Sequence, residues 1–336
     1  MIVLSDCLTE RLDEGCIKVA NSLTRRIKQK YPDTVVVSYN RKPKNSDIHL
    51  NLNKLFLNRK LFSLIKSNTS VLYIPFASNT LGSAVRTFML SLFGRKPIKV
   101  IFALRFPMGF LTKLLLKLSK AEIVALSGES YDFYKKEIGN VSYLKTGIDV
   151  GRFLPVNTEE KLRLKEKYGI PTDKKLVLHI GHLKDGRNVE KLLDIDGKYT
   201  VMLVTSTVTR DKINSELKNK LQNCPNIVLL DTFVEHIEEI YQMSDVYLFP
   251  VQKNQNCIDV PLSVLEAAAC NIPIVTTEYG ELKAFKGEKG MYFVDDLSKE
   301  ALNRTIDTAA CVSDCNNREA VLEYDFEKSV IALMSK

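Results

Sequence analysis

The chain has 336 residues, of which 45% are hydrophobic and 26% charged, so it has the composition of a globular protein. This composition excludes disordered, fibrous and disulfide-scaffold proteins, and the length predicts two domains. The seven cysteines are scattered, no apolar run reaches membrane-spanning length, and from the first residues we expect no secretory leader. We therefore expect reduced thiols and a cytoplasmic location.

The charge is distributed unevenly along the chain. Residues 1–150 contain 24 Lys and Arg against 11 Asp and Glu, whereas residues 151–336 contain 24 against 29. Twelve basic residues and no acidic residue lie between Asp47 and Glu122. Such a stretch is typical of a surface that meets phosphorylated lipid, an anionic membrane or nucleic acid, although an ordinary solvated basic face has the same composition.

Continuous apolar runs of strand length alternate with helical segments in the first half of the chain. We predict strands over residues 1–4, 35–39, 71–76, 99–104 and 122–126, and helices over residues 16–30, 81–93 and 110–120. Strands whose residues are apolar throughout, rather than at every second position, indicate parallel strands that are buried on both faces.

The same alternation restarts after a polar segment, residues 147–175, that reads as a linker followed by a short helix. Further strands are predicted over residues 176–180, 200–204, 226–230, 246–249 and 274–276. The fold class is therefore α/β, with two Rossmann-like, doubly wound parallel-sheet domains facing a central cleft. We place the domains at 1–155 and 156–322, followed by a C-terminal helix at 323–336 that crosses back to the first domain.

Several common site motifs are missing from the sequence. No G-x-G-x-x-G follows the first strand, and no P-loop motif occurs, so both of these phosphate cradles are excluded. The four histidines and the Cys311–Cys315 pair lack metal-ligand spacing, and Asp194 and Asp196 fall at the end of a predicted helix. The sequence therefore predicts no metal site.

The positive signal lies in residues 259–276, DVPLSVLEAAACNIPIVT, which read as a loop, a helix and a strand. Leu262 and Ser263 fall at the start of the helix, where backbone N–H groups can bind a phosphate. Glu266, one turn further, can accept hydrogen bonds from the two vicinal hydroxyls of a ribose. The alternative is an ordinary amphipathic helix with a solvent-facing glutamate.

This stretch resembles the donor-binding signature of the GT-B fold retaining glycosyltransferases of the large family 4-like group, the glycosyl transferases group 1. Further matching segments occur in the same order as in the family: KTGID at 145–149 with FLP at 153–155, HIGHLKDGRN at 179–188, IVLLDTF at 227–233, and IYQMSDVYLFP at 240–250. The resemblance covers residues 145–336 well and residues 1–144 only in outline.

The resemblance implies a role for each matching residue at the nucleotide. Glu266 would hold the donor ribose, the amides of Leu262 and Ser263 the diphosphate, and Thr232 and Phe233 would flank the base. Gly181 would let the backbone approach the donor, with His182 in place of the family's arginine. Arg187, where the family places a lysine, and Lys184 would neutralise the leaving diphosphate.

Other parts of the chain also depart from the family pattern or match it weakly. Ile258 occupies the position of a family glutamate near the transferred sugar, so we assign the neighbouring Asp259 as the catalytic carboxylate. The segment 103–110 lacks the histidine of many relatives, and Arg105 is its nearest polar residue. Glu14 and Gly15 fit the family's glycine loop, which approaches both the diphosphate and the acceptor.

The resemblance implies that a sugar is transferred from UDP or GDP, with retention and without a metal or other cofactor. We expect an acceptor that is lipid-linked or a cell-surface glycan precursor, and a protein that is cytoplasmic or peripheral at the inner face of the cell membrane. A DNA-modifying glycosyltransferase, a nucleotide-sugar epimerase and a catalytically silent binding or partner protein are the alternatives.

The pattern of the predicted helix at 110–120 gives an indication of the kind of acceptor. Its apolar residues Phe110, Leu111, Leu114, Leu115 and Leu118 share one face, and Lys113, Lys117 and Lys120 share the other. This pattern suits a helix lying on a membrane surface. A helix that packs its apolar face on a sheet would show the same pattern.

Overall fold

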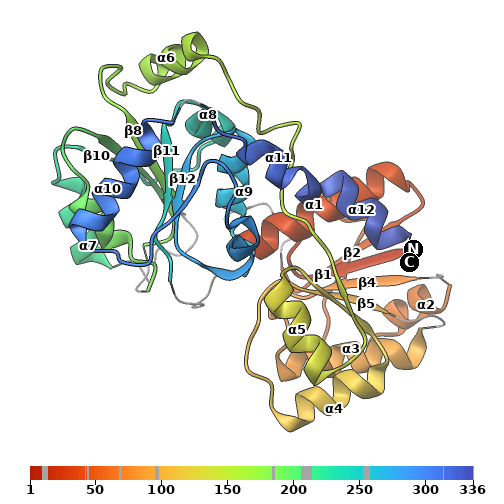
Figure 1. Ribbon diagram of the computed structural model, residues 1–336. Helices are drawn as coiled ribbons and strands as arrows, with labels where there is room; N and C mark the ends of the chain where they lie inside the picture. Colours follow the sequence, from red (N-terminus) through yellow and green to blue (C-terminus); the bar gives the residue numbers. More distant parts are fainter. Residues whose placement is uncertain are drawn as a thin grey trace. The chain divides into compact units, whose positions relative to one another are not determined.

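A computed structural model describes residues 1–9, 14–41, 43, 45–67, 70–94, 98–183, 186–205, 214–252, 258–312 and 314–335 (Figure 1). The chain divides into two compact α/β units. Unit 1 contains Met1–Gly147, Asn256–Val260 and Phe326–Lys336, and unit 2 contains Ile148–Gln255 and Pro261–Asp325. The predicted fold class, two domains that each have a parallel sheet, is confirmed.

The described residues of unit 1 form a seven-stranded parallel sheet in the order β3-β2-β1-β4-β5-β6-β7. Its strands are β1 (Ile2–Ser5), β2 (Val35–Tyr39), β3 (Ile48–Leu50), β4 (Val71–Ile74), β5 (Lys99–Phe102), β6 (Glu122–Ala125) and β7 (Val141–Tyr143). Its helices are α1 (Gly15–Lys30), α2 (Arg59–Ser67), α3 (Leu81–Phe93), α4 (Phe110–Ser119), α5 (Gly128–Glu137) and α12 (Phe326–Met334). Helices α1 and α12 lie on one side of the sheet, and α2, α3 and α4 lie on the other (Figure 1).

The described residues of unit 2 form a six-stranded parallel sheet in the order β10-β9-β8-β11-β12-β13. Its strands are β8 (Leu176–Gly181), β9 (Thr200–Thr205), β10 (Ile227–Leu230), β11 (Val246–Phe249), β12 (Ile274–Thr276) and β13 (Met291–Phe293). Its α-helices are α6 (Thr158–Lys167), α7 (Ser215–Gln222), α8 (Ile237–Gln242), α9 (Leu262–Ala269), α10 (Lys299–Ala310) and α11 (Asn317–Val321). Short 3-10 helices are η1 (Val189–Asp194), η3 (Gly280–Phe285) and η4 (Leu322–Tyr324).

Both sheets reverse their strand order at one point. In unit 1, β1 pairs with β2 on one side and with β4 on the other. In unit 2, β8 pairs with β9 on one side and with β11 on the other. Loops that leave two such neighbouring strands turn to opposite faces of the sheet, and the crevice between them is where open α/β sheets bind ligands.

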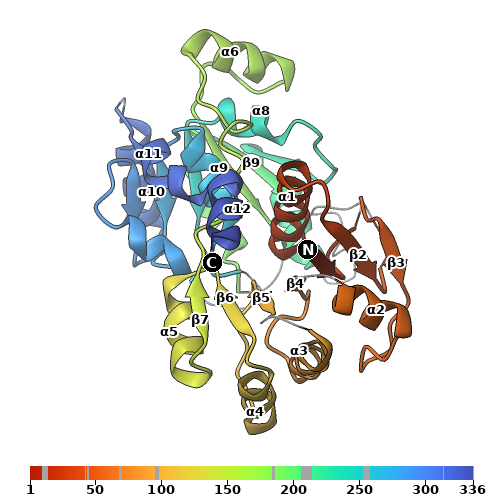
Figure 2. The ribbon, with the colours of Figure 1, turned by 90° about the vertical axis from the view of Figure 1, so that its right-hand side faces the viewer.

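The C-terminal helix α12 belongs to unit 1 and packs beside α1 (Figure 2). Arg26 on α1 forms an ion pair with Glu327 at 2.6 Å, and the Lys99 ammonium donates to the carbonyl of Leu333 at 2.6 Å. Among the described residues, no helix is long and apolar enough to cross a membrane.

Helix α4 differs from a helix that packs its apolar face on a sheet. The side of α4 that is buried contains Thr112, Leu116 and Ser119. The exposed fractions of its large apolar residues are 81% for Phe110, 52% for Leu111, 38% for Leu114 and 56% for Leu118. Most of the predicted apolar face is therefore open to the surroundings.

Candidate functional site

Two of the segments predicted to bind a ligand in unit 2 lie where its strand order reverses. Gly181 ends β8 and is followed by His182, and both are half-buried. Helix α9 begins at Leu262, in the connection that follows β11. The structure therefore brings two predicted segments, from positions about eighty residues apart, to the same edge of one sheet.

The first turn of α9 has two backbone donors that its own helix cannot satisfy. Pro261 is the N-cap residue, and its carbonyl accepts hydrogen bonds from the amides of Val264 at 3.0 Å and Leu265 at 3.3 Å. No described residue accepts a hydrogen bond from the amides of Leu262 and Ser263. Free amides at the positive end of a helix dipole suit a phosphate.

Glu266 lies in the second turn of α9, and it is buried rather than solvent-facing. The residue is only 5% exposed, and the hydroxyl of Tyr241 on α8 donates to its Oε2 at 2.7 Å. Burial, together with the charge of Glu266, holds the pKa of Tyr241 well above its usual value, so this hydroxyl keeps its proton. The sequence identified Glu266 but gave no indication of its partner.

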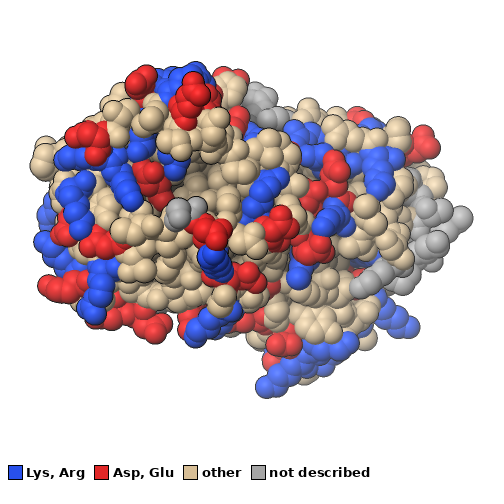
Figure 3. All heavy atoms as spheres, turned by 45° about the horizontal axis from the view of Figure 1, so that its top comes forward, with Lys and Arg blue, Asp and Glu red and all other residues tan. Residues whose placement is uncertain are grey.

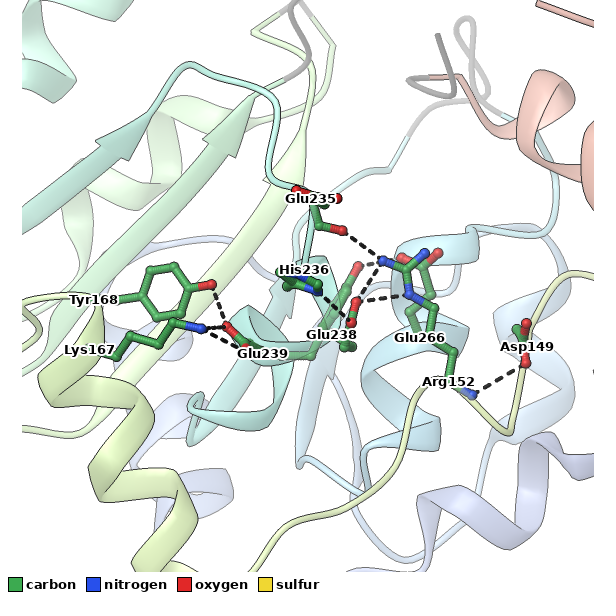
Figure 4. A network of polar contacts seen from close by, with 10 residues as sticks. Asp149, Arg152, Lys167, Tyr168, Glu235, His236, Glu238, Glu239 and Glu266 are labelled. Atoms are coloured by element: carbon green, nitrogen blue, oxygen red, sulfur yellow. Dashed lines mark hydrogen bonds and ion pairs between the residues drawn. The ribbon is translucent and has the colours of Figure 1, made fainter. Parts of the chain in front are cut away.

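Helix α8, which carries Tyr241, is tied down by ion pairs at its first turn (Figure 4). Arg152 donates to Glu238 through Nε at 2.8 Å and through a terminal nitrogen at 2.6 Å. Lys167 and Tyr168 both donate to Glu239, the shortest distance being 2.6 Å in each case. Hydrogen bonds from Lys167 and Tyr168 lower the pKa of Glu239. The segment between β7 and β8 therefore fixes the position of α8.

Strand β8 contains a buried histidine, His179, for which the sequence predicted no role at the site. The Nδ1–H of His179 donates to the carbonyl of Leu248 on β11 at 2.8 Å, and burial lowers its pKa to about 4. The imidazole is therefore neutral near pH 7, with its lone pair on Nε2. A Cβ at Gly181 would lie 2.8 Å from this Nε2, so a side chain at residue 181 would displace the imidazole.

Arg187 lies in the loop after β8 and is 8% exposed. Its charge contributes, after burial, to the lowered pKa of His179. The adjacent Asn188 has a positive φ of 54° and donates to the carbonyl of Pro250 at 2.8 Å, so it links the loops that follow β8 and β11. Lys184 lies outside the described residues.

Thr232 and Phe233 follow β10, an edge strand of the sheet. Both are exposed, and the exposed fraction of Phe233 is 72%. No hydrogen bond or ring contact between described residues joins them to Glu266 or Gly181. The structure thus leaves an open aromatic ring at the carboxyl end of β10, separate from the buried part of the site.

The remaining predicted residues lie in unit 1. Glu14 is the N-cap residue of α1, and a Cβ at Gly15 would lie 2.6 Å from the Cδ1 atom of Ile258. The segment around Ile258 thus packs on the start of α1. Among the described residues, no group of three or more His, Cys, Asp or Glu could hold a metal ion.

Asp259, the predicted catalytic carboxylate, is 5% exposed and belongs to unit 1. Its Oδ2 accepts hydrogen bonds from Ser127 at 3.1 Å and Ser130 at 2.5 Å, at the start of α5. The Nε of Arg105 lies 3.5 Å from the same oxygen, and Arg105 also pairs with Glu129 at 2.9 Å. These contacts hold the carboxylate in unit 1, so its catalytic role remains a prediction.

The profile of the glycosyl transferases group 1 family matches residues 175–310. In its fold the chain is similar to a glycosyltransferase from Rickettsia africae ESF-5, with 14% identity, a TM-score of 0.77, and coverage of 99% of this chain and 97% of that one. It is also similar to Anabaena HepE in complex with UDP, with 13% identity, a TM-score of 0.76, and coverage of 99% of both chains.

A curated relative is TuaC of Bacillus subtilis (strain 168), whose name places it in teichuronic acid biosynthesis as a glycosyltransferase. It is 23% identical over 189 residues, which are 56% of this chain and 46% of TuaC, so the chain spans about half the length of this relative. The matched residues include the strand that ends at Gly181 and the helix that carries Glu266. Residues 175–310 are therefore similar to the glycosyl transferases group 1 family, and the chain has the GT-B architecture of two parallel α/β units.

Proposed function

We propose that the chain is a glycosyltransferase that moves a sugar from a nucleoside diphosphate donor to an acceptor, with retention of the anomeric configuration. The observation that supports this proposal best is that the buried Glu266 lies one turn after the free amides of Leu262 and Ser263 on the same helix. A carboxylate and two amides one turn apart match a ribose and its attached diphosphate. HepE, which shares the fold, has been solved with UDP and with UDP-glucose.

The charge at this edge of the sheet suits departure of the diphosphate. As the bond to the sugar breaks, negative charge grows on the leaving phosphate oxygens, and preorganised donors and cations stabilise it. The amides of Leu262 and Ser263 supply donors, and Arg187, in the loop that follows β8, supplies a guanidinium. The exposed ring of Phe233 offers a stacking surface for the base, which is UDP or GDP in this proposal.

A thermal-shift screen tests the donor site. The protein is heated with UDP, GDP, ADP and their common sugar conjugates, because a ligand that binds the folded state raises the melting temperature. We expect stabilisation by one nucleotide, and loss of this stabilisation in Glu266→Ala. A protein that melts at the same temperature with every nucleotide would contradict the proposal.

The identity of the reaction needs a second measurement. The donor found in the screen is incubated with lipid extracts, and the anomeric configuration of the product is read by NMR. A glycosylated lipid product with the donor's configuration supports the proposal. Conversion of the donor sugar without an acceptor would indicate an epimerase, and nucleotide binding without any turnover would indicate a silent binding protein.

We propose that the acceptor is lipid-linked or a precursor of a cell-surface glycan, and that α4 lies on an anionic membrane. The exposed apolar side chains Phe110, Leu111, Leu114 and Leu118 stand next to Lys117 and Lys120, which are also exposed. Such a helix can bury its apolar side chains at the headgroup boundary while its lysines meet anionic lipid. The face drawn in Figure 3 mixes acidic and basic side chains, with a group of basic ones at its lower edge.

Sedimentation with vesicles tests this contact. We expect the protein to bind vesicles of phosphatidylcholine with phosphatidylglycerol, and the double variant Phe110→Ser/Leu114→Ser to lose binding. Leu162→Ser on α6 is the matched control, since Leu162 is 40% exposed and lies in unit 2. Binding to DNA with steep salt dependence, and no binding to vesicles, would instead favour a DNA-modifying enzyme.

A further inference from the structure

Two arginines of unit 1 stand at the point where the strand order of its sheet reverses. Arg41 follows the carboxyl end of β2, and its amide donates to the carbonyl of Tyr39 at 2.8 Å. Arg86 lies in the second turn of α3, the helix that follows β4. Because β2 and β4 flank β1, both side chains belong to the edge at which such sheets bind ligands.

The guanidinium of Arg41 lies over an aromatic ring. The central carbon of its guanidinium lies 4.0 Å from the centre of the Phe76 ring. The backbone amide of Phe76 donates to Oδ1 of Asp6 at 2.8 Å, and Asp6 directly follows β1. This cation–π contact keeps the fork of donors on Arg41 oriented without using them.

Arg86 is surrounded by aromatic rings that are completely buried. Its guanidinium carbon lies 5.3 Å from the ring centre of Phe56 and 5.9 Å from that of Tyr39, whose hydroxyl is 3.1 Å from the hydroxyl of Tyr73. The Nε atom of Arg86 is buried, and no described residue accepts a hydrogen bond from it. Burial alone would lower the pKa of Arg86. The interactions with Tyr73, Tyr39 and Asp6 have the larger effect, so the pKa of Arg86 is raised.

The charge of these two arginines is not balanced within the described part of the chain. Neither guanidinium forms an ion pair with a described carboxylate, and Asp6 is an acid whose charge acts on Arg86 from the same edge of the sheet. A partly buried cation is costly unless an anion accompanies it. An arginine fork is also the group that best matches the oxygens of phosphate or carboxylate.

We propose that Arg41 and Arg86 bind a phosphate monoester carried by the acceptor. A monoester has a charge of about −1.5 to −2 near neutral pH, so it suits two guanidinium groups better than a carboxylate does. Asp6, at the same edge, can accept a hydrogen bond from a hydroxyl next to the phosphate. This inference rests on the proposed function, because it treats unit 1 as the acceptor side of a glycosyltransferase.

The phosphate can belong to a soluble phosphorylated sugar or to a lipid headgroup, and two sets of probes separate these sources. Soluble probes are glucose 6-phosphate, glucose and glucuronate, titrated calorimetrically. Membrane probes are phosphatidylcholine vesicles with phosphatidic acid, a monoester, or with phosphatidylglycerol, a diester. The variants are Arg41→Ala and Arg86→Lys, and Arg59→Ala on α2 is the control, since it removes the same charge from an exposed position of unit 1.

We expect the wild type to bind glucose 6-phosphate, or phosphatidic acid vesicles, at least about tenfold more tightly than glucose or phosphatidylglycerol vesicles. Arg41→Ala and Arg86→Lys each weaken this binding by about tenfold, and Arg59→Ala leaves it unchanged. Preference for the sugar assigns a soluble acceptor, and preference for the vesicle assigns a lipid-borne one. Either preference supports the proposal.

Equal affinity of the wild type and Arg41→Ala for the preferred monoester would overturn it, as would equal binding of glucuronate and glucose 6-phosphate. A titration with UDP runs in parallel on every variant. If UDP binds normally while no monoester binds, the arginine site fails and the donor site stands. If the wild type binds no nucleotide at all, the proposed function fails independently of the arginines.

Discussion

Tyr241→Phe is the substitution that tests most specifically how the fold prepares Glu266. It removes one oxygen atom and keeps the ring, which packs edge-on against Phe153 with ring centres 5.6 Å apart. The lost hydrogen bond is 2.7 Å long, and its acceptor Glu266 is 5% exposed. Water therefore has little access to replace the hydroxyl.

The size of the effect follows from this burial. A hydrogen bond to a charged group contributes about 1.5–3 kcal/mol, so we expect Tyr241→Phe to lower the free energy of unfolding by about 2 kcal/mol. Affinity for the donor nucleotide falls as well, because the carboxylate loses the contact that orients it. Tyr134→Phe in unit 1 is the control: its hydroxyl donates to the neutral carbonyl of Leu104 at 3.1 Å, which contributes about 1 kcal/mol.

A double-mutant cycle with Glu266→Gln isolates the pair. Urea unfolding, followed by circular dichroism, gives the free energies for the wild type, the two single variants and the double variant. We expect a coupling energy of about 1–2 kcal/mol between Tyr241 and Glu266. A coupling energy near zero, or a Tyr241→Phe protein that is as stable as the wild type, would refute the view that this hydroxyl holds Glu266.

Three further predictions concern the same unit. Burial lowers the pKa of His179 from 6.5 to about 4, so the unfolded chain binds a proton in this range that the native chain does not. Stability therefore falls by up to about 3 kcal/mol as the pH drops through this window, and His179→Asn, unfolded by urea at several pH values, loses this dependence. Lys165→Met removes the buried partner of Asp245, 2.7 Å away, and leaves Lys161 at 3.2 Å, so we expect a loss of about 2 kcal/mol with unchanged nucleotide binding. Gly181→Ala displaces His179 and weakens nucleotide binding in the thermal-shift assay.

The alternation of strands and helices was readable from the sequence because buried parallel strands are apolar throughout. Helix α3 coincides with its prediction, and α1 and α4 differ from theirs by one residue at one end. The three-residue strands β3, β7 and β13 were missed, as were α2 and α5. Three residues at a sheet edge carry too little hydrophobic pattern to be recognised without the strand that they pair with.

The candidate site was predictable where its chemistry is local. The start of α9, with the amides of Leu262 and Ser263, and Glu266 one turn later follow from the order of residues 261–266, so their positions could be predicted from the sequence. The partner of Glu266 is 25 residues away, and the partners of Asp259 are about 130 residues away. Only the packed fold brings such groups together.

Exposure was the second property that the sequence left open. The apolar positions of α4 were identified correctly, but periodicity alone does not say whether an apolar face meets a sheet or the surroundings. The structure buries the side of Thr112 and Leu116 and exposes Phe110. That difference turns an ordinary amphipathic pattern into a candidate membrane surface.

The central claim is that the carboxyl edge of unit 2 binds a nucleoside diphosphate through Glu266 and the start of α9. Calorimetric titration of UDP and GDP into the wild type and Glu266→Ala tests it most directly, with urea unfolding to show that both are folded. We predict that one nucleotide binds the wild type and binds the folded variant at least about tenfold more weakly. Equal affinity for the two folded proteins would contradict the site.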